Sequence, residues 1–306
     1  MKLVFLGTAD FAVPSLRASA EHHEVIAVIT QPEREGSRGR PAPRPVADEA
    51  RSLGVDVWHP QRLRERATVA RVLELRADAL VVAAYGQIIP AELLDGVALG
   101  GVNVHASLLP RWRGAAPVAA AILAGDAETG VSIMQMDAGV DTGPVFMRRP
   151  VAIAPDATAP TLTATLARIG AGALLEVLAG LGTGEAAALP QVEPDATYAP
   201  RLTRSDGQVD WNAQTAVEVD RRLRALQPWP GVVAPLAGAR VQLLGGAPVD
   251  LEDGEPGTLA GVSGESVIVA TRAGGYRIDA VKPPGSRAMS PAAFLRGRRS
   301  AAEASR

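Results

Sequence analysis

The sequence contains no cysteine, and only two of its 31 basic residues are lysines, Lys2 and Lys282. Without cysteine, the chain forms no disulfide and has neither a cysteine nucleophile nor a thiolate metal site. Its four histidines are scattered rather than spaced as metal ligands (His22, His23, His59 and His105). We therefore expect an activity that needs no metal.

Long apolar runs and nucleotide-binding loops are also missing. No run approaches the roughly 20 apolar residues that span a bilayer, and the N-terminus MKLVFLGTADFAVPSL lacks the apolar stretch and cleavage site of a signal peptide. The first turn, GTADFA, lacks the G-x-G-x-x-G of dinucleotide-binding folds, and no G-x-x-x-x-G-K-[ST] loop occurs. These absences predict a cytoplasmic protein that is neither a dinucleotide enzyme nor a P-loop NTPase.

The composition is that of a globular protein large enough for two domains. The chain has 306 residues, of which 47% are hydrophobic and 21% charged. Its net charge of −2 does not indicate a nucleic-acid partner, but dividing the chain near residue 203 gives about −4 before and +2 after. Arginines cluster at 34–44, 221–224 and 294–299.

The first half alternates short apolar runs with helical patterns. An opening strand, helix and strand are predicted, followed by a weaker strand and two buried strands (Lys2–Leu6, Asp10–Ala20, Val25–Thr30, Val55–Trp58, Ala79–Ala84 and Gly101–His105). This order predicts an α/β fold, a Rossmann-like open parallel sheet covered by helices. Ligands of such folds bind at the carboxyl ends of the strands.

The second half predicts a different architecture. A long helical pattern at 158–180 closes a first domain, placed at 1–188, and a polar, proline-containing linker covers 189–210. Another helical pattern at 213–226 precedes short apolar runs between Gly-rich turns (Ala239–Leu244, Ser266–Ala270 and Tyr276–Val281). We expect residues 211–306 to form a small, OB-like β-barrel domain.

Asn103 and His105 are the first candidates for chemistry. They lie two apart on a predicted strand, so both side chains project from one face. An amide and an imidazole placed together could hold the oxygen of a carbonyl under attack. On spacing alone, an ordinary hydrogen-bonded histidine and a loop-capping asparagine are favoured.

Asp137 and Asp141 lie in the acidic turn MDAGVDTGP. A carboxylate near His105 would stabilise the imidazolium and help to collect a proton. The alternative is that both aspartates serve only the turn, as most Asp residues in such sequences do. The residues alone leave both interpretations open.

The segment 101–144 resembles the formyltetrahydrofolate-dependent formyltransferases, which pair an N-x-H strand end with an SLLP turn and a downstream D-x-x-x-D-T-G. The resemblance implies that 10-formyltetrahydrofolate is the formyl donor, that a substrate amine attacks the formyl carbon, and that no metal takes part. It implies a catalytic trio and a set of folate-binding residues (Asn103, His105 and Asp141; Ser107, Leu108, Leu109, Pro110, Tyr85 and Asp137).

Members of that family act on glycinamide ribonucleotide, UDP-amino-sugars or charged initiator tRNA. Residues 206–231 resemble a junction into a C-terminal barrel, which argues against the first group but not the second. ITQPEREGSRGR resembles the basic loop of the tRNA-directed members, with Arg38 as the key residue and Arg34 and Arg40 as helpers. The segment 287–300 resembles their C-terminus.

We therefore expect a monomer that formylates methionyl-tRNA, the charged initiator tRNA, with a UDP-amino-sugar as the alternative substrate. Thr8 and Phe11 are expected to shape the methionine pocket. Solvated surface arginines, or an RNA-binding module without catalysis, are the competing interpretations of the basic clusters.

Overall fold

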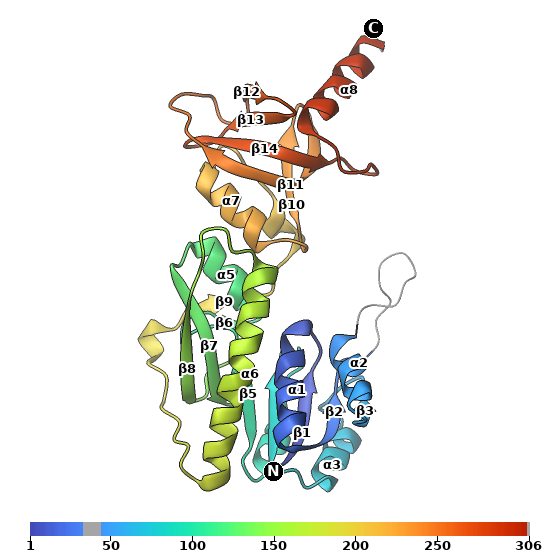
Figure 1. The fold of residues 1–306 in the computed structure, drawn as a ribbon, viewed down its shortest axis with the longest axis vertical. Coiled ribbons are helices and arrows are strands. Elements are labelled where there is room, and N and C mark those ends of the chain that lie inside the picture. The colour runs from blue at the N-terminus through green and yellow to red at the C-terminus, as the bar shows by residue number, and fades with distance from the viewer. Residues whose placement is uncertain (33–43, 305–306) are drawn as a thin grey trace. The chain divides into compact units, whose positions relative to one another are not determined.

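The computed structural model describes residues 1–32 and 44–304, the last six of these by backbone alone (Figure 1). The chain divides into two compact units. The first comprises Met1–Val118, Ala127–Ala154 and Pro160–Pro200, and the second comprises Ala119–Asp126, Pro155–Ala159 and the chain from Arg201 onward. The sequence-based division at 1–188, 189–210 and 211–306 stays a prediction.

The first unit is built on a seven-stranded sheet of order β3-β2-β1-β4-β5-β7-β8. Its strands are β1 (Lys2–Gly7), β2 (Glu24–Ile29), β3 (Val57–Trp58), β4 (Ala79–Ala83), β5 (Gly101–His105), β7 (Glu128–Gln135) and β8 (Val145–Ala152). The helices between them are η1 (Asp10–Ala12), α1 (Val13–His22), α2 (Pro45–Ser52), α3 (Arg66–Glu74), α4 (Ala91–Gly96), α5 (Pro117–Ala124), most of which belongs to the second unit, and α6 (Ala159–Thr183). The predicted α/β fold with a mainly parallel sheet is confirmed.

The last two strand pairings of the sheet, β5 with β7 and β7 with β8, are antiparallel. The sequence did not predict this. β1 to β5 pair in parallel, whereas β7 is antiparallel to both β5 and β8. A parallel return needs a crossover of a dozen or more residues. Only residues 136–144 join β7 to β8, so β8 must return beside β7 in the opposite direction.

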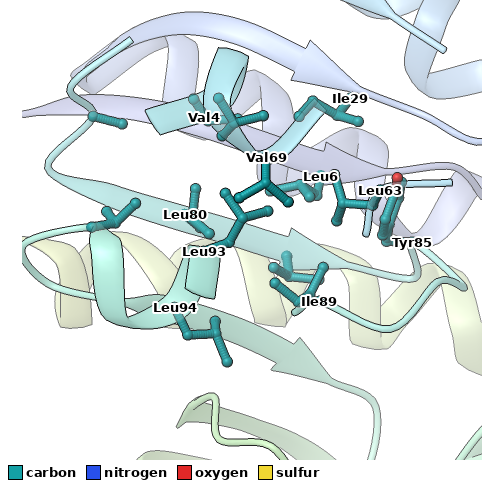
Figure 2. Packing of buried hydrophobic residues seen from close by; sticks show 14 of the residues in the cluster. Val4, Leu6, Ile29, Leu63, Val69, Leu80, Tyr85, Ile89, Leu93 and Leu94 are labelled. Carbon is teal, nitrogen blue, oxygen red and sulfur yellow. The ribbon is translucent and has the colours of Figure 1, made fainter. Parts of the chain in front are cut away.

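One face of the sheet carries a hydrophobic cluster, shown in Figure 2. Val4, Leu6 and Leu80 come from the strands and pack against Val69 of α3 and Leu93 of α4, all at most 1% exposed. Successive strand residues point to opposite faces of a sheet, so alternate residues such as Val4 and Leu6 share this buried face. Their burial fixes the register of the central strands. Their carboxyl ends meet at one edge of the sheet.

The other face is covered by α1 and α6, which run in front of the sheet in the view of Figure 1. Gly170 of α6 lies directly against Val104 of β5 and Val131 of β7. Contrary to the expectation from the sequence, α6 is long and apolar enough to cross a membrane by length and composition alone. A core helix that packs on a sheet passes the same test, and α6 packs in this way.

The second unit contains a five-stranded antiparallel sheet of order β10-β11-β14-β13-β12. Its strands are β10 (Val232–Leu236), β11 (Ala239–Val249), β12 (Leu259–Ser263), β13 (Ser266–Ala270) and β14 (Gly275–Lys282). The helices α7 (Ala216–Ala225) and α8 (Pro291–Ala304) and the 3-10 helix η4 (Arg204–Gly207) accompany them. The predicted C-terminal β domain is confirmed, and its arrangement is consistent with an OB-like barrel.

Candidate active site

Strand β5 places Asn103 and His105 at the carboxyl edge of the large sheet. The strand lies between β4 and β7, with Asn103 opposite Val82 and Met134, and His105 opposite Ser132. Val104, between them, points to the opposite face and meets α6. Neighbours on both sides therefore hold Asn103 and His105 on a rigid element, facing the same way.

Asp141 brings the two side chains together. Asn103 Nδ2 lies 3.4 Å from Asp141 Oδ1, and His105 Nδ1 lies 3.6 Å from Asp141 Oδ2. Asn103 is 9% exposed and His105 6%, while the Asp141 side chain is 17% exposed. The Asn103 amide and the His105 imidazole thus approach different oxygens of the Asp141 carboxylate, where little of each side chain is exposed to water.

The imidazole of His105 is oriented by a backbone carbonyl. Its Nε2 lies 3.0 Å from the carbonyl oxygen of Trp112, which can only accept a hydrogen bond, so Nε2 carries a proton. The neutral ring then has its lone pair on Nδ1, beside the Asp141 carboxylate. Two acceptors facing each other leave a place for one additional proton between Nδ1 and Oδ2.

Asp141 itself is held from several directions. Its Oδ2 accepts a hydrogen bond from the N–H of Gly114 at 2.8 Å, and its carbonyl oxygen accepts one from Gln191 Nε2 at 2.8 Å. Its backbone is left-handed, with φ +54°. Sequence reasoning missed Trp112, Gly114 and Gln191. The first two act through backbone groups, which no residue type reveals.

The Ser107–Pro110 turn is braced by hydrogen bonds to Arg111 and to Ser132 of β7. The Ser107 hydroxyl donates to the Arg111 carbonyl at 2.6 Å, and the Leu109 N–H donates to Ser132 Oγ at 3.0 Å. Leu109 is buried and precedes Pro110 through a cis peptide bond. Leu108 and Pro110 are the half-buried members of the turn, so the surface that a ligand could meet is mainly theirs.

Tyr85 and Asp137 lie apart from the trio's contacts. Tyr85 packs in the core cluster beside Leu6 and Leu63 (Figure 2), and burial raises the pKa of its phenol above the ordinary range. Asp137 Oδ1 accepts hydrogen bonds from Gly139 N at 3.0 Å and from Thr142 Oγ1 at 2.8 Å. Asp137 therefore organises its own turn, and the folate-binding roles of both residues stay predictions.

The other predicted residues are placed as follows. Thr8 Oγ1 donates to the Tyr85 carbonyl at 3.0 Å, and Phe11 is buried at the start of η1, so their link to a methionine pocket stays a prediction. Arg34, Arg38 and Arg40 lie outside the described residues. Within the described part of the chain, no group of three or more His, Asp or Glu could hold a metal ion.

Comparison with known proteins identifies the family of the chain. The formyl transferase family profile matches residues 1–178, and the profile of the formyl transferase C-terminal domain matches residues 201–299. The chain belongs to the formyl transferase family. It is 46% identical over 302 residues to the methionyl-tRNA formyltransferase of Xanthomonas euvesicatoria, covering 98% of each chain. It is 48% identical over 303 residues to that of Gluconacetobacter diazotrophicus, covering 97% of this chain and 96% of the relative.

Solved structures share the fold at low sequence identity. HypX from Aquifex aeolicus, in complex with tetrahydrofolic acid, aligns with a TM-score of 0.65 at 20% identity over 96% of this chain. The chain spans about half of HypX, 47% of its length. WlaRD, a sugar 3N-formyl transferase solved in the presence of dTDP and 5-N-formyl-THF, aligns at 0.68 with 16% identity, covering 94% of this chain and 99% of WlaRD.

Proposed function

We propose that this protein transfers the formyl group of 10-formyltetrahydrofolate to the α-amino group of methionyl-initiator-tRNA. The observation that carries the proposal is the convergence of Asn103 and His105 on the Asp141 carboxylate. The chain's 46% identity to a methionyl-tRNA formyltransferase over nearly its whole length supports the choice of substrate. The product would be N-formylmethionyl-tRNA for the initiation of translation.

The side chains at this site suit the transfer of a formyl group. 10-Formyltetrahydrofolate supplies an activated formyl carbon when it is bound. Asn103 Nδ2, which has a second hydrogen besides the one directed at Asp141, would donate a hydrogen bond to the formyl oxygen as negative charge builds on it. His105, once its Nδ1 has taken a proton, would place positive charge near that oxygen. Because both side chains are at least nine-tenths buried, these groups would act where water screens little.

The proton from the attacking amine also has a place to go. The amine nitrogen forms a bond to the formyl carbon, the bond from that carbon to N10 breaks, and one proton must leave the amine while one reaches N10. The His105 Nδ1 and Asp141 Oδ2 pair, which lacks a proton between its two acceptors, would take the first proton. No metal step and no covalent bond to the protein are needed.

A UDP-amino-sugar is the competing substrate. WlaRD, a solved sugar formyltransferase, is only 16% identical to this chain, so that likeness supports the fold alone. Identity of 44–48% to methionyl-tRNA formyltransferases favours the tRNA substrate. We further propose a cytoplasmic monomer, with folate contacts at Ser107, Leu108, Leu109 and Pro110.

The test is formyl transfer with defined acceptors. Purified protein is given 10-formyltetrahydrofolate with methionyl-initiator-tRNA, and separately with a UDP-amino-sugar. We expect formylation of the tRNA alone, and a loss of at least about 100-fold in His105→Ala with tRNA affinity retained. His22→Ala, on an exposed histidine at the far end of α1, is the matched control. Unchanged turnover in His105→Ala would refute the site.

The basic loop is tested separately. Arg38→Ala is expected to raise the KM for tRNA while binding of the folate donor changes little, because a phosphate contact is lost. Arg64→Ala, at an exposed arginine of the first unit, serves as the control. Normal use of tRNA by the Arg38 variant would show that the loop assignment is wrong.

A further inference from the structure

Building on the proposed function, we propose that Gln191 is a positioning residue that holds the Asp141 turn in the geometry required for formyl transfer. Gln191 lies 50 positions after Asp141 in the sequence, in the segment that follows α6. It is distinct from Asn103, His105 and Asp141, because it touches the backbone of the turn rather than the reacting groups. Its role would be to keep the carboxylate aimed at His105.

The amide of Gln191 is fully used by its neighbours. Nε2 donates to the carbonyl oxygen of Asp141 at 2.8 Å and to that of Gly143 at 2.7 Å. Oε1 accepts a hydrogen bond from Arg113 Nε at 3.0 Å. Carbonyl oxygens only accept and a guanidinium only donates, so the amide has one possible orientation here. Gln191 therefore fixes both ends of the Asp141–Gly143 segment at once.

Arg113 holds the oxygen end of the Gln191 amide. Its side chain is fully buried, and both terminal nitrogens bind Glu193 at 2.8 and 2.9 Å. Its backbone N–H donates to the Thr197 carbonyl at 2.9 Å, within the short pairing of β6 (Arg113–Gly114) with β9 (Tyr198–Ala199). The Arg113 hydrogen bonds hold the pKa of Glu193 below its ordinary value, so the pair stays charged.

The same short strand reaches Asp141 by a second route. Gly114, next to Arg113, donates its N–H to Asp141 Oδ2 at 2.8 Å. β6 thus holds the carboxylate of Asp141 directly, through the Gly114 N–H. It holds the backbone of Asp141 indirectly, through Arg113 and then Gln191. A displacement of the turn should weaken the Gly114 hydrogen bond and the approach to His105 together.

The Asp141 turn needs this external support because it has little core of its own. Residues 137–140 are exposed, and Val140 is 62% exposed. Asp141 adopts φ +54°, a left-handed conformation that most L-residues with side chains disfavour and that Asp tolerates better than most. Such conformations persist where the surroundings over-determine them. Two hydrogen bonds from Gln191, one to the carbonyl oxygen of Asp141 and one to that of Gly143, supply that constraint.

Two substitutions separate the possible roles of Gln191. Gln191→Met keeps the length of the side chain but removes its donors and its acceptor. Gln191→Glu keeps a partner for Arg113 but sets oxygens against the carbonyls of Asp141 and Gly143. If Gln191 served only Arg113, the Glu variant would be active. If it positions the turn, both variants should be slow.

The kinetic expectation follows from the sensitivity of catalysis to position. A misplacement of about 1 Å costs roughly 100-fold, so we expect kcat to fall at least about tenfold in both variants. The KM values for folate and tRNA should stay within about threefold, because the Gln191 amide is already bonded to Asp141, Gly143 and Arg113 within the protein. In an Asp141→Asn background, Gln191→Met should change kcat less than twofold. Additive losses, or an active Glu variant, would overturn the inference.

Gln135→Met is the matched control. Gln135 is also a partly buried glutamine whose Nε2 donates to a backbone carbonyl, that of Leu99 at 3.2 Å. Its backbone N–H donates to the Pro144 carbonyl at the end of the Asp141 turn, and the substitution keeps that bond. We expect its kcat within twofold of wild type. Circular dichroism and the melting temperature of every variant separate loss of position from loss of fold.

A readout without turnover keeps this inference independent of the proposed function. Hydrogen exchange at the Gly114 amide reports its bond to Asp141 directly. Gln191→Met should speed that exchange at least about tenfold, while Gln135→Met leaves it unchanged. Unaltered exchange in Gln191→Met would overturn the inference even if wild type is active. Failure of wild type to formylate tRNA would sink only the proposed function.

Discussion

Two of the four glycines in helix α6 test how tightly it packs against the strand carrying the site. A methyl group added at Gly170 would lie 2.8 Å from Val104 Cγ1 and 3.3 Å from Val131 Cγ1. Gly172, two residues later on the same helix, is exposed, and an added methyl group meets nothing within 4 Å among the described residues. Gly170→Ala and Gly172→Ala therefore make the same chemical change in opposite surroundings.

The expected magnitudes follow from two opposing terms. Replacing a helical glycine with alanine stabilises by about 1 kcal/mol, and this gain applies at both positions. Ordinary contacts begin at 3.4 Å, so Gly170→Ala must move Val104 or α6 by about 0.6 Å in a close-packed region. Overpacking of this kind costs about 1–3 kcal/mol. The two variants should thus differ by about 1–3 kcal/mol, with Gly172→Ala the more stable.

Urea denaturation of both variants measures the difference directly. Because the helix-propensity gain cancels between them, the difference reports the contact of α6 with β5. Val104 lies between Asn103 and His105, so Gly170→Ala should also lower kcat, while Gly172→Ala should not. Equal stability of the two alanine variants would refute the packing of α6 on β5 described above.

Further predictions concern capping, pH and buried phenols. Thr215 accepts a hydrogen bond from Glu218 N at the start of α7, so Thr215→Ala should cost about 1 kcal/mol in urea denaturation. Hydrogen bonding from the Thr215 N–H lowers the pKa of Glu218 from its ordinary value of 4.5, so its stabilisation is complete above pH 4.5 and disappears as pH falls through the folded-state pKa. Glu218→Gln should flatten that acid loss; an unchanged slope below pH 4.5 would contradict the assignment. Burial raises the pKa of Tyr85 and Tyr276, so absorbance titration should show two of the three tyrosines ionising only on unfolding.

Much of the fold could be predicted from hydrophobic runs. β5 and β13 have the predicted bounds, because a continuous apolar run between turn residues defines a buried strand. β12 was not predicted, since Leu259–Ser263 is mostly exposed and carries little pattern. β11 extends past its predicted end to Val249, because Gly245 and Gly246 form a bulge rather than a turn.

The site was only partly accessible from the sequence. The spacing of Asn103 and His105 predicted a shared face, but the residues alone left Asp137 and Asp141 open, and only the family resemblance singled out Asp141. Asp137 binds Thr142 within its own turn, whereas Asp141 reaches both strand residues. Contacts through backbone groups and across long sequence separations leave no local pattern.

The most direct test of the proposed site is a crystal structure of the protein with a formyl-tetrahydrofolate. We predict that the formyl oxygen lies within about 3.2 Å of Asn103 Nδ2 or of a His105 ring nitrogen. The formyl carbon should be open to an amine from the side of Asp141. A folate bound at another edge of the sheet, or a formyl group beyond the reach of all three side chains, would contradict the account.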